Sequence, residues 1–127
     1  IWKDLLEGKP PKLVGKSPFT GRITNSILKS NVTKRINTVL RSAVEIKIGV
    51  TGDIEARIDK KDYRKRFDFI IRIYKTKSTE VARNYEVTLI KKYKKSHPNK
   101  VLNISEGRAG RLTTYDGYYH IYVVFNK

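Results

Sequence analysis

A glutamate interrupts the apolar face of a predicted helix in the second half of the chain. The spacing of apolar residues predicts a helix over residues 79–95. Its apolar stripe consists of Ala82, Tyr85, Leu89, Ile90 and Tyr93. Glu86 lies inside that stripe. An ionised carboxylate facing a core loses hydration unless a cation or hydrogen bonds replace it. We therefore expect Glu86 to form a salt bridge with an arginine or to bind a divalent cation, magnesium or manganese, for which carboxylate oxygen is a suitable ligand.

A second candidate group lies upstream, where a predicted strand leads into a short helix. Residues 44–50 alternate apolar and polar side chains, which predicts a strand, and residues 53–64 follow as a helix. Arg57 and Lys61 share one face of that helix and should point toward the sheet. Gly49 lacks a side chain, so a phosphate could approach the strand backbone closely there. The planar guanidinium of Arg57 suits recognition of that phosphate.

These segments together resemble the GIY-YIG nuclease family. The letters K-I-G-V-T at residues 47–51 resemble a lysine-containing form of the family's second motif, and Arg57 matches its catalytic arginine, eight residues after the glycine. Glu86, with a small residue four positions before it, matches the metal-binding glutamate, and Asn103 matches an asparagine in the following loop. The resemblance covers residues 44–103. It implies a small α/β, or α+β, sandwich with a central, mostly antiparallel sheet flanked by helices.

The resemblance also implies a mechanism, that of a metal-dependent phosphodiesterase acting on DNA. Glu86 would bind one magnesium (or manganese) ion at the scissile phosphate. Arg57 would neutralise the charge that develops on phosphorus. A tyrosine would activate the attacking water, and Lys47 or Lys61 would lower the pKa of that tyrosine. The products would be a 5′-phosphate and a 3′-hydroxyl.

The tyrosine that this mechanism needs is missing from its usual place. Lys47 occupies the position of the family's motif tyrosine, and no strand with the first motif precedes it. Residues 117–125 predict a later strand that contains His120-Ile121-Tyr122. If this strand pairs beside residues 44–50, it would supply the missing element by a circular permutation, with Tyr122 as the activating tyrosine. The alternative is an ordinary edge strand whose tyrosines are half-buried.

The charge of the chain indicates a polyanionic partner. Lysine and arginine number 28 against 12 acidic residues, which gives a formal charge of +16. Neutralising phosphates with such residues releases counterions and favours binding. No segment approaches the roughly 20 apolar residues of a membrane span. An anionic membrane surface is the rival partner, but no basic amphipathic helix of the interfacial type stands out. We therefore expect DNA, in double-stranded form, and no membrane. The expected nucleic-acid contacts are Gly49, Arg57, Lys61, Asn103, Arg108 and Arg111, the last two in a loop rich in Gly and Arg.

The remaining pattern predicts one domain preceded by an arm. Residues 1–22 are broken by Gly and Pro and should form an irregular basic arm. Residues 23–127 should form the nuclease-like domain. Its predicted elements are a helix over 23–44 with a possible break at Asn31 or Thr33, then strand 44–50, helix 53–64, strand 67–76, helix 79–95, loop 103–114 and strand 117–125.

Two functions besides that of an endonuclease remain open. A catalytically inactive GIY-YIG-like module that only binds DNA is favoured by the missing tyrosines and opposed by the retention of Arg57 and Glu86. A basic RNA-binding or ribosomal protein would explain the charge but gives no reason for Glu86 on an apolar stripe. The chain has no cysteine, which fits a reducing intracellular compartment, cytoplasmic or nuclear. Residues 17–22 resemble the P-x-T-G-R core of adaptor modules of large DNA viruses, which implies a viral or phage source.

Overall fold

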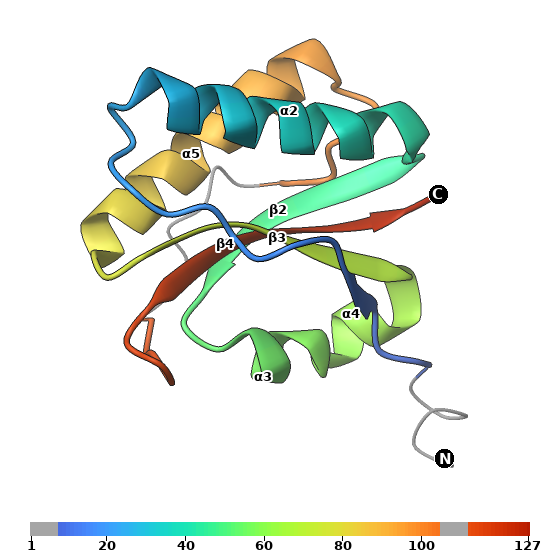
Figure 1. Cartoon of the computed structure of the whole chain (residues 1–127). Helices are drawn as coiled ribbons and strands as arrows, with labels where there is room; N and C mark the ends of the chain where they lie inside the picture. The colour runs from blue at the N-terminus through green and yellow to red at the C-terminus, as the bar shows by residue number, and fades with distance from the viewer. Residues whose placement is uncertain (1–7, 105–111) are drawn as a thin grey trace.

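A computed structural model describes residues 8–104 and 112–127, apart from the side chain of Lys61. A four-stranded sheet lies between α2 and α5 on one side and α3 and α4 on the other (Figure 1). The elements in chain order are β1 (Lys12–Val14), α2 (Ser26–Ser42), β2 (Glu45–Thr51), α3 (Ile54–Ile58), α4 (Lys61–Arg66), β3 (Phe69–Thr76), α5 (Thr79–Ser96) and β4 (Tyr119–Asn126).

The strands follow the order β1-β3-β4-β2. Strand β4 pairs antiparallel with both β3 and β2, and β1 joins β3 in parallel. The predicted α+β arrangement, a small and mostly antiparallel sheet flanked by helices, is therefore confirmed. The predicted pairing of the last strand with residues 44–50 is also confirmed, and Tyr122 lies opposite Gly49. The alternative of an edge strand is wrong, because β4 has a strand on each side.

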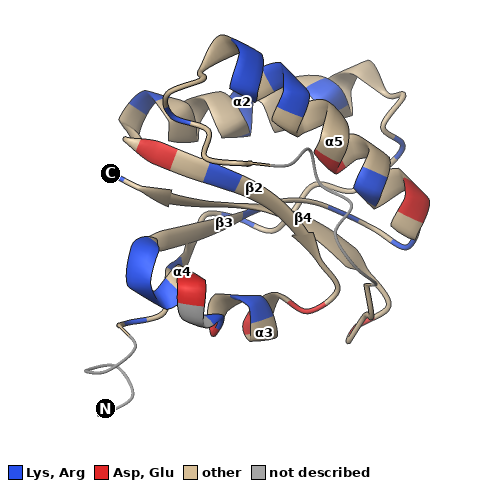
Figure 2. Cartoon of the chain, turned by 180° about the vertical axis from the view of Figure 1, so that it is seen from behind, with Lys and Arg blue, Asp and Glu red and all other residues tan. Residues whose placement is uncertain are grey.

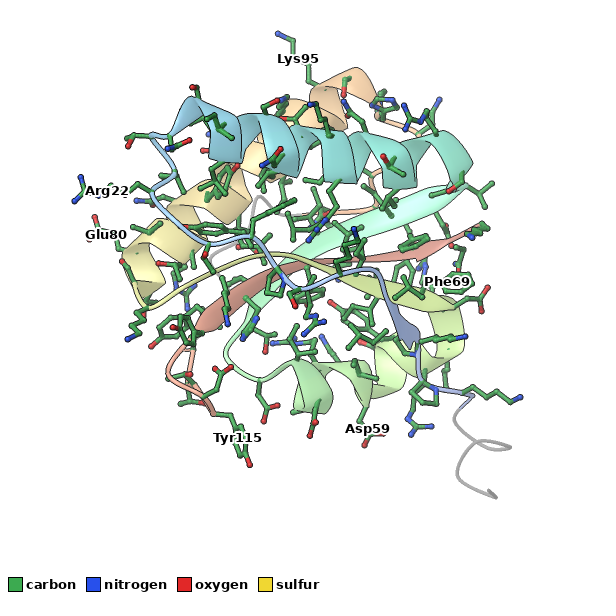
Figure 3. All side chains as sticks on the ribbon, viewed as in Figure 1. Arg22, Asp59, Phe69, Glu80, Lys95 and Tyr115 are labelled. Carbon is green, nitrogen blue, oxygen red and sulfur yellow. The ribbon has the colours of Figure 1, made fainter. Side chains whose placement is uncertain are left out.

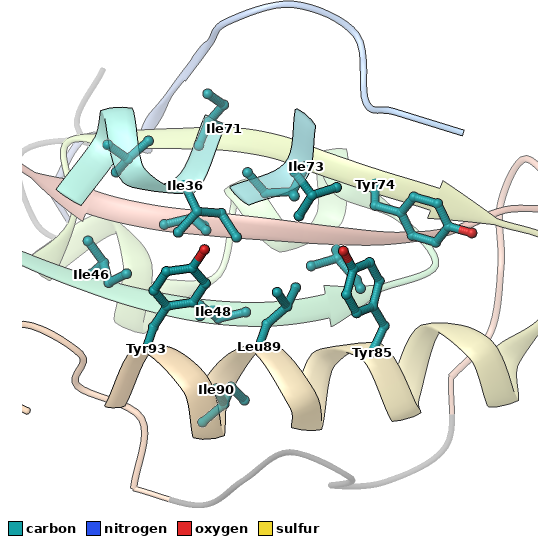
Figure 4. Packing of buried hydrophobic residues seen from close by; sticks show 14 of the residues in the cluster. Ile36, Ile46, Ile48, Ile71, Ile73, Tyr74, Tyr85, Leu89, Ile90 and Tyr93 are labelled. Carbon is teal, nitrogen blue, oxygen red and sulfur yellow. The ribbon is translucent and has the colours of Figure 1, made fainter. Parts of the chain in front are cut away.

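Helices α2 and α5 cover one face of the sheet and form the larger core with it. The Asn25 side chain caps α2 by accepting hydrogen bonds from the Ile27 and Leu28 amides, and Ser78 caps α5. Tyr85, Leu89 and Tyr93 of α5 point toward the strands (Figure 4). The break that Asn31 or Thr33 could have introduced is not present, since α2 is continuous. None of the described helices has the length and apolarity to cross a membrane.

Helices α3 and α4 cover the opposite face and form a smaller core. This second core consists of Tyr63, Phe67, Ile70, Tyr122 and Val124. The single helix predicted over residues 53–64 is wrong, because the backbone leaves the helix at Asp59 and is extended at Lys60. The Asp59 carboxylate accepts two hydrogen bonds from Arg64, 2.9 and 2.5 Å long, and so ties the start of the turn to α4. The break turns α4 so that Tyr63 packs against the sheet.

Part of the predicted irregular arm belongs to the sheet. Residues Lys12–Val14 pair with Phe69–Ile71 of β3, and Phe19 forms a further bridge to Tyr74. Three residues between glycines and prolines are too few to show a clear alternation, so the sequence pattern did not reveal this strand. The boundary between arm and domain at residue 22 stays a prediction.

Side chains fill the space on both faces of the sheet, and exposed groups such as Lys95 and Tyr115 point outward (Figure 3). One contact between β2 and β4 is especially close. A Cβ atom built on Gly49 would lie 2.3 Å from the Tyr122 hydroxyl oxygen and 2.5 Å from the ring carbon that carries it. Any side chain at residue 49 would therefore displace the Tyr122 ring, which is 1% exposed.

Gly49→Ala should destabilise the protein by about 1–3 kcal/mol, because the added methyl overpacks the second core. Urea unfolding followed by circular dichroism measures this change. Tyr122→Leu shortens the residue opposite, so the double variant should cost less than the sum of the two single changes. Additive costs would contradict the contact between residues 49 and 122.

The buried tyrosines should make the fold sensitive to alkali. Burial raises the pKa of Tyr63, Tyr74, Tyr93 and Tyr122, and raises the pKa of Tyr85 to about 12. Tyrosines of the unfolded chain ionise near pH 10. The stabilisation is therefore fully present below about pH 10 and is lost as pH rises through the folded-state pKa values.

Tyr85→Phe should weaken the dependence of the unfolding free energy on pH between about 10 and 12. The control is Tyr115→Phe, since Tyr115 is 85% exposed. Urea unfolding at a series of pH values measures both slopes. Equal slopes for Tyr85→Phe and the unchanged protein would contradict the role given to burial.

Candidate active site

Two phenol groups meet on the face of the sheet that α3 and α4 cover. The hydroxyl oxygens of Tyr63 and Tyr122 lie 2.7 Å apart in a buried hydrogen bond in which either group can donate. Their rings contact edge to face, with centroids 6.1 Å apart. Tyr122 is enclosed in the second core, whereas Tyr63 also lines an open pocket. Tyr63 is 3% exposed, so it is the member of the pair that borders a pocket although its ring is buried.

Cations from three segments surround this phenol pair. The Lys47 and Lys60 ammonium nitrogens lie 5.8 and 5.2 Å from the centre of the Tyr63 ring. The charge of half-buried Arg57 acts to lower the pKa of both phenols. Burial lowers the pKa of Lys60, and the charges of Arg57 and Lys47 lower it further. The cations thus lie close enough to repel one another, and an anion between them would relieve that repulsion.

Glu86 reaches the same region from α5. Its side chain is 5% exposed and lies in the buried stripe of that helix, so its predicted place on the core-facing side is confirmed. The negative charge of Glu86 acts to raise the pKa of both Tyr63 and Tyr122. The carboxylate is therefore within electrostatic reach of the phenol pair, although α5 covers the other face of the sheet. Helix α5 contacts β2, which is an edge strand of the sheet, and this contact brings the Glu86 carboxylate within that reach.

The effect of the lysines on Tyr122 differs from the prediction. We expected Lys47 or Lys61 to lower the pKa of the activating tyrosine. Instead, burial raises the pKa of Tyr122 well above its ordinary value, and the charge of Arg57 opposes only part of that rise. Helix α4 covers the face of β4 that carries Tyr122, which explains this burial. Both phenols are consequently protonated at neutral pH.

Two residues expected to contact nucleic acid have structural tasks. Asn103 is buried, and its side-chain amide accepts a hydrogen bond from the Ile48 amide (3.0 Å) and donates one to the Ile48 carbonyl (2.8 Å). The Asn103 side chain therefore satisfies the backbone N–H and C=O of Ile48, as a neighbouring strand would do at this edge of the sheet. The space beside Gly49, where we expected a phosphate, contains the Tyr122 hydroxyl. Gly49 thus positions the tyrosine rather than a ligand.

Tyr63 is the residue that the sequence analysis missed. It is the only apolar or aromatic side chain between Ile58 and Phe67, in the otherwise charged run K-K-D-Y-R-K-R of residues 60–66. A single aromatic ring among charged residues indicates which side of a short helix packs against the sheet. Phe67 lies on that same side, one helical turn after Tyr63. That signal was present in the sequence. A continuous helix over residues 53–64 would not turn Tyr63 toward the sheet, whereas the break before α4 does.

Three of the predicted contacts cannot be placed. Arg108 and Arg111 lie outside the described residues, and so does the side chain of Lys61. The charges of Arg57 and Glu86 act on the Tyr63 and Tyr122 phenols, and Lys47 and Lys60 lie beside the Tyr63 ring. Lys47 and Tyr63 line one pocket, and Arg57 and Lys60 line a neighbouring one, so the catalytic role of this set stays a prediction.

The donor groups of the region are compatible with one kind of metal ion. Within residues 8–104 and 112–127, no cluster of three or more His, Asp or Glu side chains could enclose a metal. Magnesium does not require such a cluster, since it usually keeps several waters and binds one or two carboxylates together with substrate phosphates. Glu86 is the buried carboxylate among the described residues that such binding would use.

Comparisons with known proteins show no family for the chain. No protein-family model matches it, and no solved structure matches it. Among curated proteins it is similar to a probable LRR receptor-like serine/threonine-protein kinase of Arabidopsis thaliana, with 27% identity over 128 residues. The match covers 94% of this chain but 13% of the plant protein. The similarity thus concerns one short part of a much longer protein.

Proposed function

We propose that this protein is a metal-dependent endonuclease that hydrolyses phosphodiester bonds of DNA in the manner of the GIY-YIG family. The observation that carries the proposal is the hydrogen-bonded pair of Tyr63 and Tyr122, with cations around it and the carboxylate of Glu86 within electrostatic reach. A protein that only needed a folded core would not gather Lys47, Arg57 and Lys60 around two phenols, because the cations repel one another.

Each group has a task that suits its chemistry. Arg57 would neutralise charge on the phosphate in the transition state, for which a guanidinium is suited. Tyr63 borders a pocket and would orient the attacking water and accept its proton when ionised. Tyr122 would hold the Tyr63 hydroxyl in place through their shared hydrogen bond. Glu86 would hold a magnesium or manganese ion, which supplies Lewis-acid stabilisation of the leaving oxygen.

A module that binds DNA without cutting it is the second candidate. The raised pKa of both phenols favours it, because a protonated phenol is a poor base at neutral pH. The two functions predict different effects of removing the Glu86 carboxylate on turnover. Only the endonuclease needs Glu86 for turnover, whereas both functions need the basic residues for binding.

Supercoiled plasmid should be converted to nicked and linear forms with magnesium or manganese, and not with a chelator. Glu86→Gln removes the charge at nearly constant volume and should reduce the rate by about two orders of magnitude or more. DNA affinity should stay within a few-fold. Glu80→Gln on the exposed start of the same helix is the matched control and should retain activity. Binding without any nicking by the unchanged protein would leave the binding module as the function.

The pH dependence of nicking should identify the base. If the ionised form of Tyr63 accepts the proton, the rate should rise about tenfold per pH unit between pH 7 and 9, below its raised pKa. Tyr63→Phe should abolish that rise and most of the activity. Tyr122→Phe should lower the rate but keep the slope, because it removes only the hydroxyl that positions Tyr63.

Tyr115→Phe serves as the control for this series, since Tyr115 is exposed. A Tyr63→Phe variant with the unchanged profile would remove Tyr63 from the mechanism. A flat profile in Tyr122→Phe alone would assign the base to Tyr122 instead.

A further inference from the structure

A pocket of about 760 Å³ opens beside Tyr63, between α4 and the segment that follows α5. We call it the α4 pocket. Basic residues at its rim come from two elements, Lys47 from β2 and Lys65 and Arg66 from α4. Figure 2 shows the basic stretch of α4 and the basic segment of β2 on the same side of the molecule. Asp62 is the acidic group among its described lining residues.

The apolar part of the pocket has a different character. Phe67 is buried in the second core, Leu102 is half-buried, and Ile104 at the mouth is fully exposed. A large aliphatic side chain beside a cationic rim gains stability when an apolar group covers it. The pocket therefore offers an apolar surface and positive charge at once. Its size is in the range of pockets that hold small organic ligands.

A nucleotide unit carries the complementary pair of properties. Its phosphate suits the cationic rim, and the flat face of its base suits the apolar surface. The occupant must be unpaired, because the faces of a paired base are stacked within the duplex and its Watson–Crick edge is occupied. Tyr63 lines the α4 pocket and is also one member of the phenol pair. The occupant would therefore lie next to the bond that the proposed active site attacks.

We propose that the α4 pocket binds one unpaired nucleotide of a DNA strand, adjacent to the scissile phosphodiester. This inference rests on the proposed endonuclease function and narrows its substrate. The preferred DNA contains a bulged or single-stranded nucleotide at the cleavage position, in place of the uninterrupted duplex that the sequence led us to expect. Lys65 and Ile104 are specificity-determining residues, since they contact the unpaired nucleotide and not the paired strand.

The test uses the whole chain and two duplexes of the same sequence, one of which carries a single bulged 2-aminopurine. Binding is measured by anisotropy in chelator, so that no cleavage occurs, and insertion of the base is followed by 2-aminopurine fluorescence. The bulged duplex should bind at least about fivefold more tightly, which is the gain expected from stacking one base. With magnesium, cleavage should occur within one or two nucleotides of the bulge.

Ile104→Glu and Lys65→Glu should each remove most of this preference. Both residues are exposed, so the variants should fold, which circular dichroism checks. Lys95→Glu is the charge-matched control, because Lys95 is an exposed residue of α5 away from the pocket lining. It should weaken binding to both duplexes equally. Free deoxyadenosine monophosphate, added as competitor, distinguishes a site for loose nucleotides from a site for a nucleotide within a strand. The proposal expects millimolar mononucleotide to compete poorly.

The outcomes separate this inference from the proposed function. Metal-dependent nicking with equal rates on both duplexes would overturn the α4 pocket assignment and leave the endonuclease in place. Bulge-specific binding that Ile104→Glu abolishes, without cleavage in any metal, would support the pocket and remove the endonuclease. Efficient competition by the mononucleotide would overturn the assignment to a DNA strand.

Discussion

The arrangement of the candidate site depends on one cross-strand contact, in which Tyr122 of β4 lies over Gly49 of β2. The absence of a side chain at Gly49 creates the space that the phenol ring fills. The ring then provides the wall against which α4 packs, and its hydroxyl fixes that of Tyr63. Asn103 contributes from the other side, because its amide holds the strand at Ile48, the residue before the glycine. The second core and the phenol pair are thus a single structure.

Burial has two opposing effects on this pair. It raises the pKa of both phenols and so disfavours the ionised form that a base requires. The same low-dielectric surroundings strengthen the attraction between a phenolate and the charges of Arg57, Lys47 and Lys60. A bound phosphate would compete for those cations, whereas its departure would return them to the phenols. If a phosphate binds, the anion that these cations face would therefore set how strongly the phenols hold their protons.

The sequence predicted features that follow from periodicity. Alternation in residues 44–50 and 117–125 predicted both strands, and the missing motif strand correctly suggested that they are neighbours. Helical spacing predicted α5 and the burial of Glu86. Features that depend on tertiary structure were not predictable. The extended conformation at Lys60 has no strong local signal, and it determines where Tyr63 points. Asn103 replaces backbone hydrogen bonds with a side chain, and pKa values follow from burial that only the fold reveals.

The central position of β4 also determines the order of assembly. Strand β4 separates β3 from β2, so these two strands do not pair with each other. Its pairings span large sequence distances, since Asn126 lies opposite Glu45, 81 residues away. Closing such long loops costs conformational entropy before the strands gain any stabilising contact. This cost slows folding. During synthesis, β2 and β3 leave the ribosome with unsatisfied edges until β4 follows. Apolar strands are therefore open to other chains at that stage, and the formal charge of +16 opposes such association by electrostatic repulsion.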